Sequence, residues 1–363
     1  MMIVKLKEIA SFSKGIQING DSLLEEGKYD YLNGGINPSG KWNEFNVKGD
    51  TVAISEGGNS CGYVNYMDSP FWCGGHCYYL YDLKCNTHYL FYALKSQQNR
   101  LMQLRSGACM PNIKKSDLGE FEFEYCTDER EQLKIVSRLV QVDSLIELKK
   151  QQLIKIDELV KSRFIELFGD PVYNTKKLPT KRLAELGSLD RGRSQHRPRN
   201  APELLGGPYP LIQTGEVANA GLYITGYSNT YSELGLKQSK MWKAGTLCIT
   251  IAANIAQTSI LTFDACFPDS VVGFIPGDLI SAIYMHYWFG FFQKILEEQA
   301  PQVAQKNINL KILSDLSVVV PNQEQQKDFI AFVEQTDKSK LAVQRSLEQL
   351  EILKKSLMQQ YFG

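Results

Sequence analysis

The densest set of side chains able to bind another molecule lies in the segment 191–199. It holds four arginines within nine residues, with one glutamine and one histidine among them. Arginine binds guanine edges and phosphates in a bidentate manner, and glutamine matches adenine. Gly192 and Pro198 favour an exposed loop. We predict that this segment contacts nucleic acid, with a merely solvated charged loop as the alternative. The candidate residues are Arg191, Arg193, Gln195, His196, Arg197 and Arg199.

Weaker candidates of similar chemistry, amides and basic groups close to Gly or Pro, occur in two corresponding parts of the chain. In the first part they are Lys14, Gln17, Asn19, Asn59, Arg105 and Lys114. In the second part they are Asn254, Gln302, Gln305 and Lys306. The stretch around Lys14 is far less charged than 191–199, so the two parts are expected to read different sequences. For Asn59 and Asn254, which follow apolar runs, an ordinary tight turn is an equally good interpretation.

A group of cysteines around one histidine could bind zinc. Its members lie within 25 residues of one another: Cys61, Cys73, His76, Cys77 and Cys85. The spacing is looser than that of structural zinc sites. In the second part of the chain, Pro268 and Val272 stand at matching positions. We therefore expect buried thiols in a strand-rich core, and keep a metal site as the less favoured alternative.

Motifs for catalysis are missing from the sequence. It contains no Gly-x-x-x-x-Gly-Lys phosphate loop and no Gly-x-Gly-x-x-Gly. The stretch Asn37-Pro38-Ser39-Gly40 lacks the aromatic residue that a DNA aminomethyltransferase uses against an extruded base. The chain has four histidines, which is little material for a catalytic set. These absences predict a chain that is not itself an enzyme.

Composition sets the broad class. A length of 363 residues favours two or three domains, and 43% hydrophobic with 22% charged residues is ordinary for a globular protein. The 40 basic and 40 acidic residues balance, which argues against a protein that simply coats nucleic acid. No apolar run reaches the roughly 18 residues of a membrane span, and the start resembles no signal peptide. We expect a cytoplasmic protein with reduced cysteines and no membrane contact.

The chain repeats itself. Residues 159–169 and 353–363 are identical at five of eleven positions, at an offset of 194. Further upstream, 48–55 matches 243–250 at an offset of 195. A period this long indicates a duplicated module rather than a solenoid. Two copies in one chain imitate a two-fold dimer and suit a target that also has two parts.

Each copy combines a mixed module with a long helix. Short apolar runs bounded by Gly or Asp predict strands, so we assign α+β modules to 1–127 and 171–322. The segments 128–170 and 323–363 carry heptad seams, which predict two helices of about 60 Å each. A narrow seam needs a partner, and a closed pseudo-two-fold requires the two helices to pair antiparallel, as a coiled coil that separates the modules. Gly169 and Pro171 should end the first helix.

With these features in hand, the whole chain resembles a specificity subunit of a type I restriction-modification system. The resemblance rests on the duplicated order of module and helix, and on the Lys-Ser-x-x-x-x-x-Phe-Gly helix ends. It also rests on Asn307-Ile-Asn-Leu followed by Val318-Val-Val-Pro321-Asn-Gln-Glu-Gln325. The first copy departs from the pattern, because Tyr125-Cys126 replaces the strand-end proline.

The resemblance implies a DNA-reading scaffold without catalytic residues. Similar proteins bind two methyltransferase subunits, which carry S-adenosylmethionine, and join restriction and translocase subunits that use ATP and Mg. Each target-recognition module would read one half of a split site on double-stranded DNA, and the helices would set the unread spacer. This chain would bind no cofactor or metal itself. Two alternatives remain open, a protein-binding assembly scaffold and, less favoured, a metal-dependent nuclease built on the cysteine group.

Overall fold

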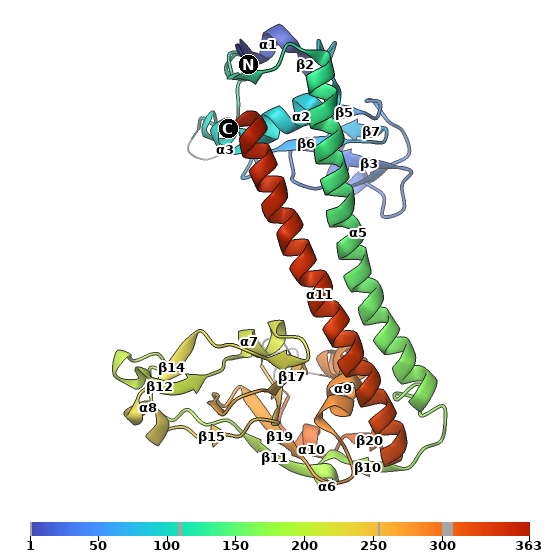
Figure 1. Cartoon of the computed structure of the whole chain (residues 1–363), viewed down its shortest axis with the longest axis vertical. Coiled ribbons are helices and arrows are strands. Elements are labelled where there is room, and N and C mark those ends of the chain that lie inside the picture. The colour runs from blue at the N-terminus through green and yellow to red at the C-terminus, as the bar shows by residue number, and fades with distance from the viewer. Residues whose placement is uncertain (1, 108–110, 253–254, 300–307) are drawn as a thin grey trace. The chain divides into compact units, whose positions relative to one another are not determined.

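The computed structural model describes residues 2–107, 111–252, 255–299 and 308–363. The chain forms two compact units, and each is described here by itself (Figure 1). The first unit comprises residues 1–151 and 344–363, and the second comprises 152–343. Each unit therefore contains one module together with part of each long helix.

The first module is built on three small sheets. One has the strand order β2-β8-β5-β6, another has the order β4-β3-β7, and β1 pairs with β9. The strands are β1 (Met2–Lys5), β2 (Ser11–Lys14), β3 (Tyr29–Leu32), β4 (Gly40–Trp42), β5 (Thr51–Ser55), β6 (Val64–Met67), β7 (Phe71–Cys73), β8 (Cys77–Tyr81) and β9 (Glu122–Tyr125). The helices are α1 (Leu6–Ile9), η1 (Gly20–Ser22), α2 (Thr87–Ser96), α3 (Gln98–Gln103) and α4 (Lys115–Gly119).

The second module repeats this plan with added strands. Its sheets have the orders β11-β19-β16-β17-β13 and β14-β12-β18-β15, and β10 pairs with β20. The strands are β10 (Thr180–Arg182), β11 (Gly187–Arg191), β12 (Leu205–Leu211), β13 (Tyr223–Ile224), β14 (Asn229–Tyr231), β15 (Met241–Trp242), β16 (Leu247–Thr250), β17 (Thr258–Leu261), β18 (Ala265–Cys266), β19 (Val271–Pro276) and β20 (Ser317–Val319). The helices are α6 (Leu183–Leu186), η2 (Pro202–Leu204), α7 (Thr214–Asn219), α8 (Glu233–Lys237), α9 (Ala282–Gln299) and α10 (Leu310–Ser314).

The core strands of the first module have counterparts in the second. The core order β2-β8-β5-β6 recurs as β11-β19-β16-β17, and β3 pairs parallel with β7 as β12 pairs parallel with β18. Strands β5 and β16 are buried throughout, as expected for apolar runs in the middle of a sheet. The prediction of an α+β chain with two similar modules is confirmed.

The two long helices are α5 (Glu129–Phe168) and α11 (Gln323–Phe362), each of 40 residues. Within the first unit, Arg138 Nη1 donates to the Tyr361 hydroxyl at 2.7 Å, and Asp143 lies 2.5 Å from Lys354 Nζ. As residue numbers rise along α5 they fall along α11, so the pairing is antiparallel, as predicted. Gly169, at φ +76°, ends α5 in the left-handed conformation that favours glycine.

The second unit shows the same antiparallel order. Lys340 Nζ lies 2.6 Å from Asp157, and the rings of Phe164 and Phe329 meet at 5.4 Å between centroids. Apolar seam residues of the helices are buried in the two cores, Ile135 and Leu139 in the first unit and Val160 and Phe329 in the second. Lys340 and Lys354 interrupt the seam of α11 with polar side chains. None of the described helices has the length and apolar character needed to cross a membrane.

Candidate nucleic-acid interface

A polar cavity of about 420 Å³ opens in the first module where strand β2 ends. Gly15 follows this strand, and a Cβ there would collide with the carbonyl oxygen of Cys73, so the chain can cross β7 this closely only without a side chain. The cavity is lined by Lys14, Asn33, Gly34, Gly35, Glu56, Gly57, Gly58, Ser60, His76, Pro111 and Asn112. Side chains from β2, β3, β5 and the β7–β8 turn thus converge on one space.

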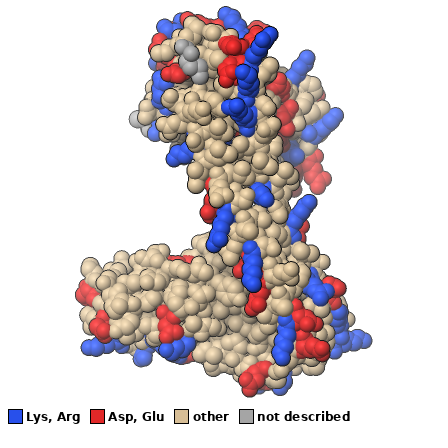
Figure 2. Space-filling view, viewed as in Figure 1, with Lys and Arg blue, Asp and Glu red and all other residues tan. Residues whose placement is uncertain are grey.

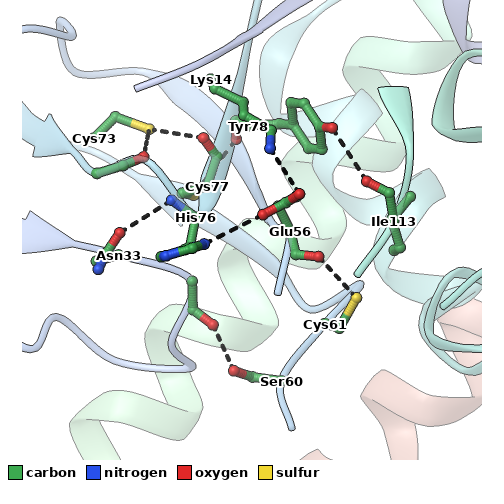
Figure 3. A network of polar contacts seen from close by, with 12 residues as sticks. Lys14, Asn33, Glu56, Ser60, Cys61, Cys73, His76, Cys77, Tyr78 and Ile113 are labelled. Carbon is green, nitrogen blue, oxygen red and sulfur yellow. Dashed lines mark hydrogen bonds and ion pairs between the residues drawn. The ribbon is translucent and has the colours of Figure 1, made fainter. Parts of the chain in front are cut away.

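One residue that lines this cavity, Glu56, lies at the centre of a network of polar contacts (Figure 3). Glu56 follows β5, and its side chain is 9% exposed. Lys14 Nζ donates to Glu56 Oε1 at 2.7 Å, and Glu56 Oε2 lies 3.4 Å from His76 Nδ1. The backbone nitrogen of His76 donates to Asn33 Oδ1 at 3.1 Å, which holds the turn in place. The carboxylate is therefore held from both sides.

Three of the cysteines near this cavity, Cys61, Cys73 and Cys77, are buried thiols. Cys61 Sγ donates to the Glu56 carbonyl at 2.9 Å, and burial raises the pKa of Cys61 to about 11. A hydrogen bond with Cys77 and burial raise the pKa of Cys73 as well. Neutral thiols are poor metal ligands. Among the described residues, no group of three or more His, Cys, Asp or Glu could hold a metal ion.

The structure brings together three of the segments predicted in this module. Gly58, beside Asn59, donates its N–H to the Pro111 carbonyl at 3.0 Å, which joins that turn to the segment after Arg105. Asn59, Arg105 and Lys114 are exposed. Gln17 is exposed beside Gly75, with its amide donating to the Ile18 carbonyl. Asn19 precedes η1 as its N-cap and is also exposed. Of the predicted residues, Lys14 alone lines the cavity.

In the second module, strand β11 ends at Arg191, and Gly192 follows as Gly15 follows β2. A Cβ on Gly192 would collide with the carbonyl oxygen of Pro268. Three arginines of the loop meet at one residue, Asp269. Arg199 Nη2 lies 2.5 Å from Asp269 Oδ1, and Arg197 Nη2 lies 3.7 Å from Oδ2. Arg191 Nε donates to the Asp269 carbonyl at 2.9 Å.

Contacts with the rest of the module hold the loop 191–199 in place. It is exposed, as predicted, but it is also anchored. The backbone nitrogens of Gln195 and His196 both donate to Gln238 Oε1, at 2.7 and 3.1 Å. The backbone nitrogen of Arg193 donates to the Phe267 carbonyl at 3.1 Å. The arginine groups are therefore positioned by the module rather than free in solvent.

A second cavity, of about 250 Å³, lies beside this loop. It is lined by Ser194, Arg199, Asn200, Leu205, Leu211, Gln213, Thr214, Asn229, Tyr231, Pro268 and Ser270. The Ser194 hydroxyl is buried and has no hydrogen-bond partner within the part of the chain that the structure describes. A buried hydroxyl without a hydrogen-bond partner is costly, so this group is a local weakness in the packing beside the loop.

The two cavities occupy corresponding places. Asn33 follows β3 in the sequence Tyr29-Asp-Tyr-Leu-Asn, and Gln213 follows β12 in Tyr209-Pro-Leu-Ile-Gln. Each amide lines its own cavity. Sequence reasoning missed these two residues, together with Glu56 and Asp269, although the shared Tyr-x-x-apolar-amide pattern could have revealed the pair.

Four predicted residues lie outside the described part of the chain: Asn254, Gln302, Gln305 and Lys306.

The surface carries basic and acidic side chains close together. On the face seen in Figure 2, basic and acidic side chains are interspersed over both modules rather than gathered into one wholly basic surface.

Comparison with known proteins gives two curated relatives from Mycoplasma, both named as type I specificity subunits. The one from Mycoplasma genitalium is 36% identical over 145 residues, which is 39% of this chain and 38% of the relative. The one from Mycoplasma pneumoniae is 34% identical over 162 residues, or 44% of this chain and 43% of the relative. Each alignment thus spans less than half of the relative's length.

Among solved structures, the fold is similar to that of the S subunit of a type I restriction-modification system from M. genitalium. The TM-score is 0.69 with 21% identity, over 100% of this chain and 96% of that one. A family model described as the type I restriction modification DNA specificity domain matches residues 1–158 and again 176–352. The duplicated module, the repeated helix and this double match together show that the chain belongs to the type I restriction-modification DNA specificity family.

Proposed function

We propose that this chain reads DNA sequence for a type I restriction-modification complex, each module contacting one half of a two-part site. One observation carries the proposal. Each module has a cavity beside the end of its first core-sheet strand, β2 or β11, and the polar side chains that line the two cavities differ. A conserved backbone with unlike polar groups is what two readers of different half-sites require, because base edges are distinguished by donors and acceptors.

The chemistry of the two modules supports this division of labour. The second module carries 14 basic and 11 acidic residues over 171–322, and its arginine loop offers bidentate donors for guanine and phosphate. The first module, residues 1–127, carries 12 basic and 14 acidic residues. At the half-site read by the first module, partner subunits would then supply much of the contact with the phosphates. The chain acts in this proposal as a reader and not as a catalyst.

Partners complete the proposal. Two methyltransferase subunits carrying S-adenosylmethionine would bind this chain, and restriction subunits using ATP and magnesium would join them in the cytoplasm. The 40-residue helices would set the number of unread base pairs between the half-sites. Half-sites read from one side of the duplex are separated by about 34 Å or a multiple of it, so helix length is a suitable ruler.

Single-molecule sequencing of methylated DNA tests the proposal. Cells would express the partner methyltransferase with and without this chain. A split methylated motif that requires the chain is the expected result, and exchange of residues 1–127 for those of a relative should change one half of it.

Two outcomes would favour other functions. If the partner is folded and bound but no motif depends on this chain, the modules bind protein and the chain is an assembly scaffold. If the isolated chain cleaves DNA and elemental analysis finds bound metal, it is a nuclease. Either outcome would overturn the proposal.

A further inference from the structure

We propose that Lys14 and Glu56 form the base-reading pair of the first module, with Glu56 accepting a hydrogen bond from the exocyclic amino group of a cytosine or an adenine. This inference rests on the proposed function, because it names the chemical group that the first half-site must present. Glu56 is not among the residues that the sequence predicted to bind DNA, although it lies three positions before the candidate Asn59.

Glu56 has the position and the capacity for this role. Its side chain is 9% exposed, and the exposed part faces the cavity of about 420 Å³. A carboxylate only accepts hydrogen bonds, and its two oxygens offer about four lone-pair sites. Lys14 occupies one site on Oε1, and His76 lies 3.4 Å from Oε2. Acceptor sites therefore remain on both oxygens.

The contacts of Glu56 with Lys14 and His76 also make a carboxylate compatible with nearby DNA. An unpaired carboxylate would be repelled by the phosphates, but Lys14 lies 2.7 Å away and offsets its charge. With Lys14 on one oxygen and His76 near the other, the carboxylate cannot turn freely (Figure 3). A group fixed in this way loses little conformational entropy when it binds.

The pair is complementary to a base-pair edge. Lys14 Nζ is a donor and Glu56 Oε1 is an acceptor, and they lie side by side. In the major groove, an acceptor likewise lies beside an exocyclic amino donor, as guanine O6 beside cytosine N4, or thymine O4 beside adenine N6. Lysine would meet the carbonyl oxygen and Glu56 the amino group. The shared requirement is therefore an exocyclic amino group.

The second module cannot read its half-site in this way. Ile251 stands at the position that corresponds to Glu56, at the same offset of 195 that relates β5 to β16. The carboxylate beside its arginine loop, Asp269, instead pairs with Arg199 and Arg197. The inference is thus specific to the first half-site, and the second half-site serves as an internal control.

The first experiment is methylation mapping with the whole complex carrying Glu56→Gln. We expect the first half-site to lose its preference at one base pair that contains cytosine or adenine, by roughly 10-fold. The second half-site should stay unchanged, which shows that the variant is folded and assembled. Glu44→Gln, at an exposed position of the same module, is the matched control and should leave both halves unchanged. An unaltered first half-site with Glu56→Gln overturns the inference, whereas a wild-type chain that directs no motif overturns the proposed function instead.

The second experiment changes the DNA and keeps the wild-type protein, so it does not depend on the folding of a variant. Each adenine of the first half-site is replaced in turn by purine, and each cytosine by 2-pyrimidinone, which removes the amino group. The readout is the affinity of the complex for the DNA, because a replacement at the methylated base itself would abolish methylation whatever Glu56 contacts. The affinity should fall about 10-fold at one position, and the base replaced there identifies adenine or cytosine. If no replacement lowers the affinity, the inference is wrong.

Combining Glu56→Gln with the sensitive DNA replacement tests whether Glu56 contacts that base directly. Where the Glu56→Gln complex is active, the sensitive DNA replacement should cost it nothing further, because the hydrogen bond is already lost. Lys14→Met should weaken the preference at the same base pair. Independent, additive effects of Glu56→Gln and the DNA replacement would show that Glu56 does not touch that base.

Discussion

The two modules keep the same backbone devices and differ in the side chains placed around them. In both, a strand ends beside a glycine, Gly15 or Gly192, that passes close under a carbonyl oxygen. The first module then presents a carboxylate held by lysine, and the second presents arginines held by Asp269. The comparison teaches that the duplicated scaffold fixes where the polar groups beside these strand ends lie, while their chemistry differs between the modules.

The helix ends show a similar contrast. Phe168 at the end of α5 packs on Tyr284 at 5.0 Å between ring centroids, and Phe362 at the end of α11 packs on Tyr89 at 5.5 Å. One turn earlier, however, the second unit has Phe164 where the first unit has Met358. The second unit therefore has a richer aromatic junction, and the following predictions test these differences from the largest expected effect to the smallest.

The largest effect is expected from Phe164→Ala. This ring is fully buried and meets the rings of Tyr284, Phe291 and Phe329 within 5.4 Å. Its loss should destabilise the second unit by about 3–5 kcal/mol through lost burial and a cavity. The matched variant Met358→Ala, at a partly buried position, should cost less than about 2 kcal/mol. Urea unfolding of both variants measures the two free energies. Equal losses of stability would show that the aromatic junction of the second unit contributes no more than the matching junction of the first.

A pH dependence should distinguish the second unit. His286 lies close to Thr258, with 3.0 Å between Nδ1 and Oγ1. Burial, together with a smaller contribution from the charge of Lys340, lowers the pKa of His286 to about 4. Because the unfolded histidine titrates near 6.5, stability should be full above that pH and fall between about 6.5 and 4.

Thermal unfolding from pH 7.5 to 4.5 measures this dependence. His286→Gln should flatten the profile, whereas His196→Gln, at an exposed position, should leave it as in the wild type. The first unit has Phe91 at the corresponding position and should lack this component. An unchanged slope in His286→Gln would show that other groups cause the acid sensitivity.

The arginine loop should act on the second half-site alone. Replacing Arg199 by Gln removes the contact with Asp269 and a bidentate donor, and we expect a loss of about 1–3 kcal/mol of discrimination at one base pair. Arg182→Gln is the control, because Arg182 pairs with Glu185 outside the loop. Methylation mapping gives the result, and an intact second half-site would remove Arg199 from the reading set.

The smallest effects are expected at the polar breaks in the helix seams. Lys340 pairs with Asp157 in the second unit, and Lys354 pairs with Asp143 in the first. Exposed ion pairs contribute about 0–1 kcal/mol, so either Lys→Met change should alter stability by no more than that. Asp143 also accepts a hydrogen bond from the Tyr92 hydroxyl at 2.8 Å, so Lys354→Met should be the milder of the two. A larger loss in denaturant unfolding would show that these pairs hold the helices together.

Much of the architecture could be predicted because its signals are local or periodic. The strands β5 and β16 and the heptad seams of α5 and α11 depend on residues a few positions apart, and the repeat is visible when the sequence is compared with itself at an offset of about 195. Gly169 marks the helix end through its own conformation. The exposed position of the loop 191–199 follows from Gly192 and Pro198 in the same way.

The groups that we propose to read DNA could not be paired from the sequence because their partners are distant in the chain. Glu56 meets Lys14 across 42 residues and Arg199 meets Asp269 across 70, and these pairs form only when the strands order themselves into sheets. The amino-acid sequence by itself thus determined the duplicated modules, the long helices and the charged loop, since local pattern specifies each of them. Only the tertiary structure decided which polar groups share a cavity, because the sheet topology, and not distance along the chain, brings them together.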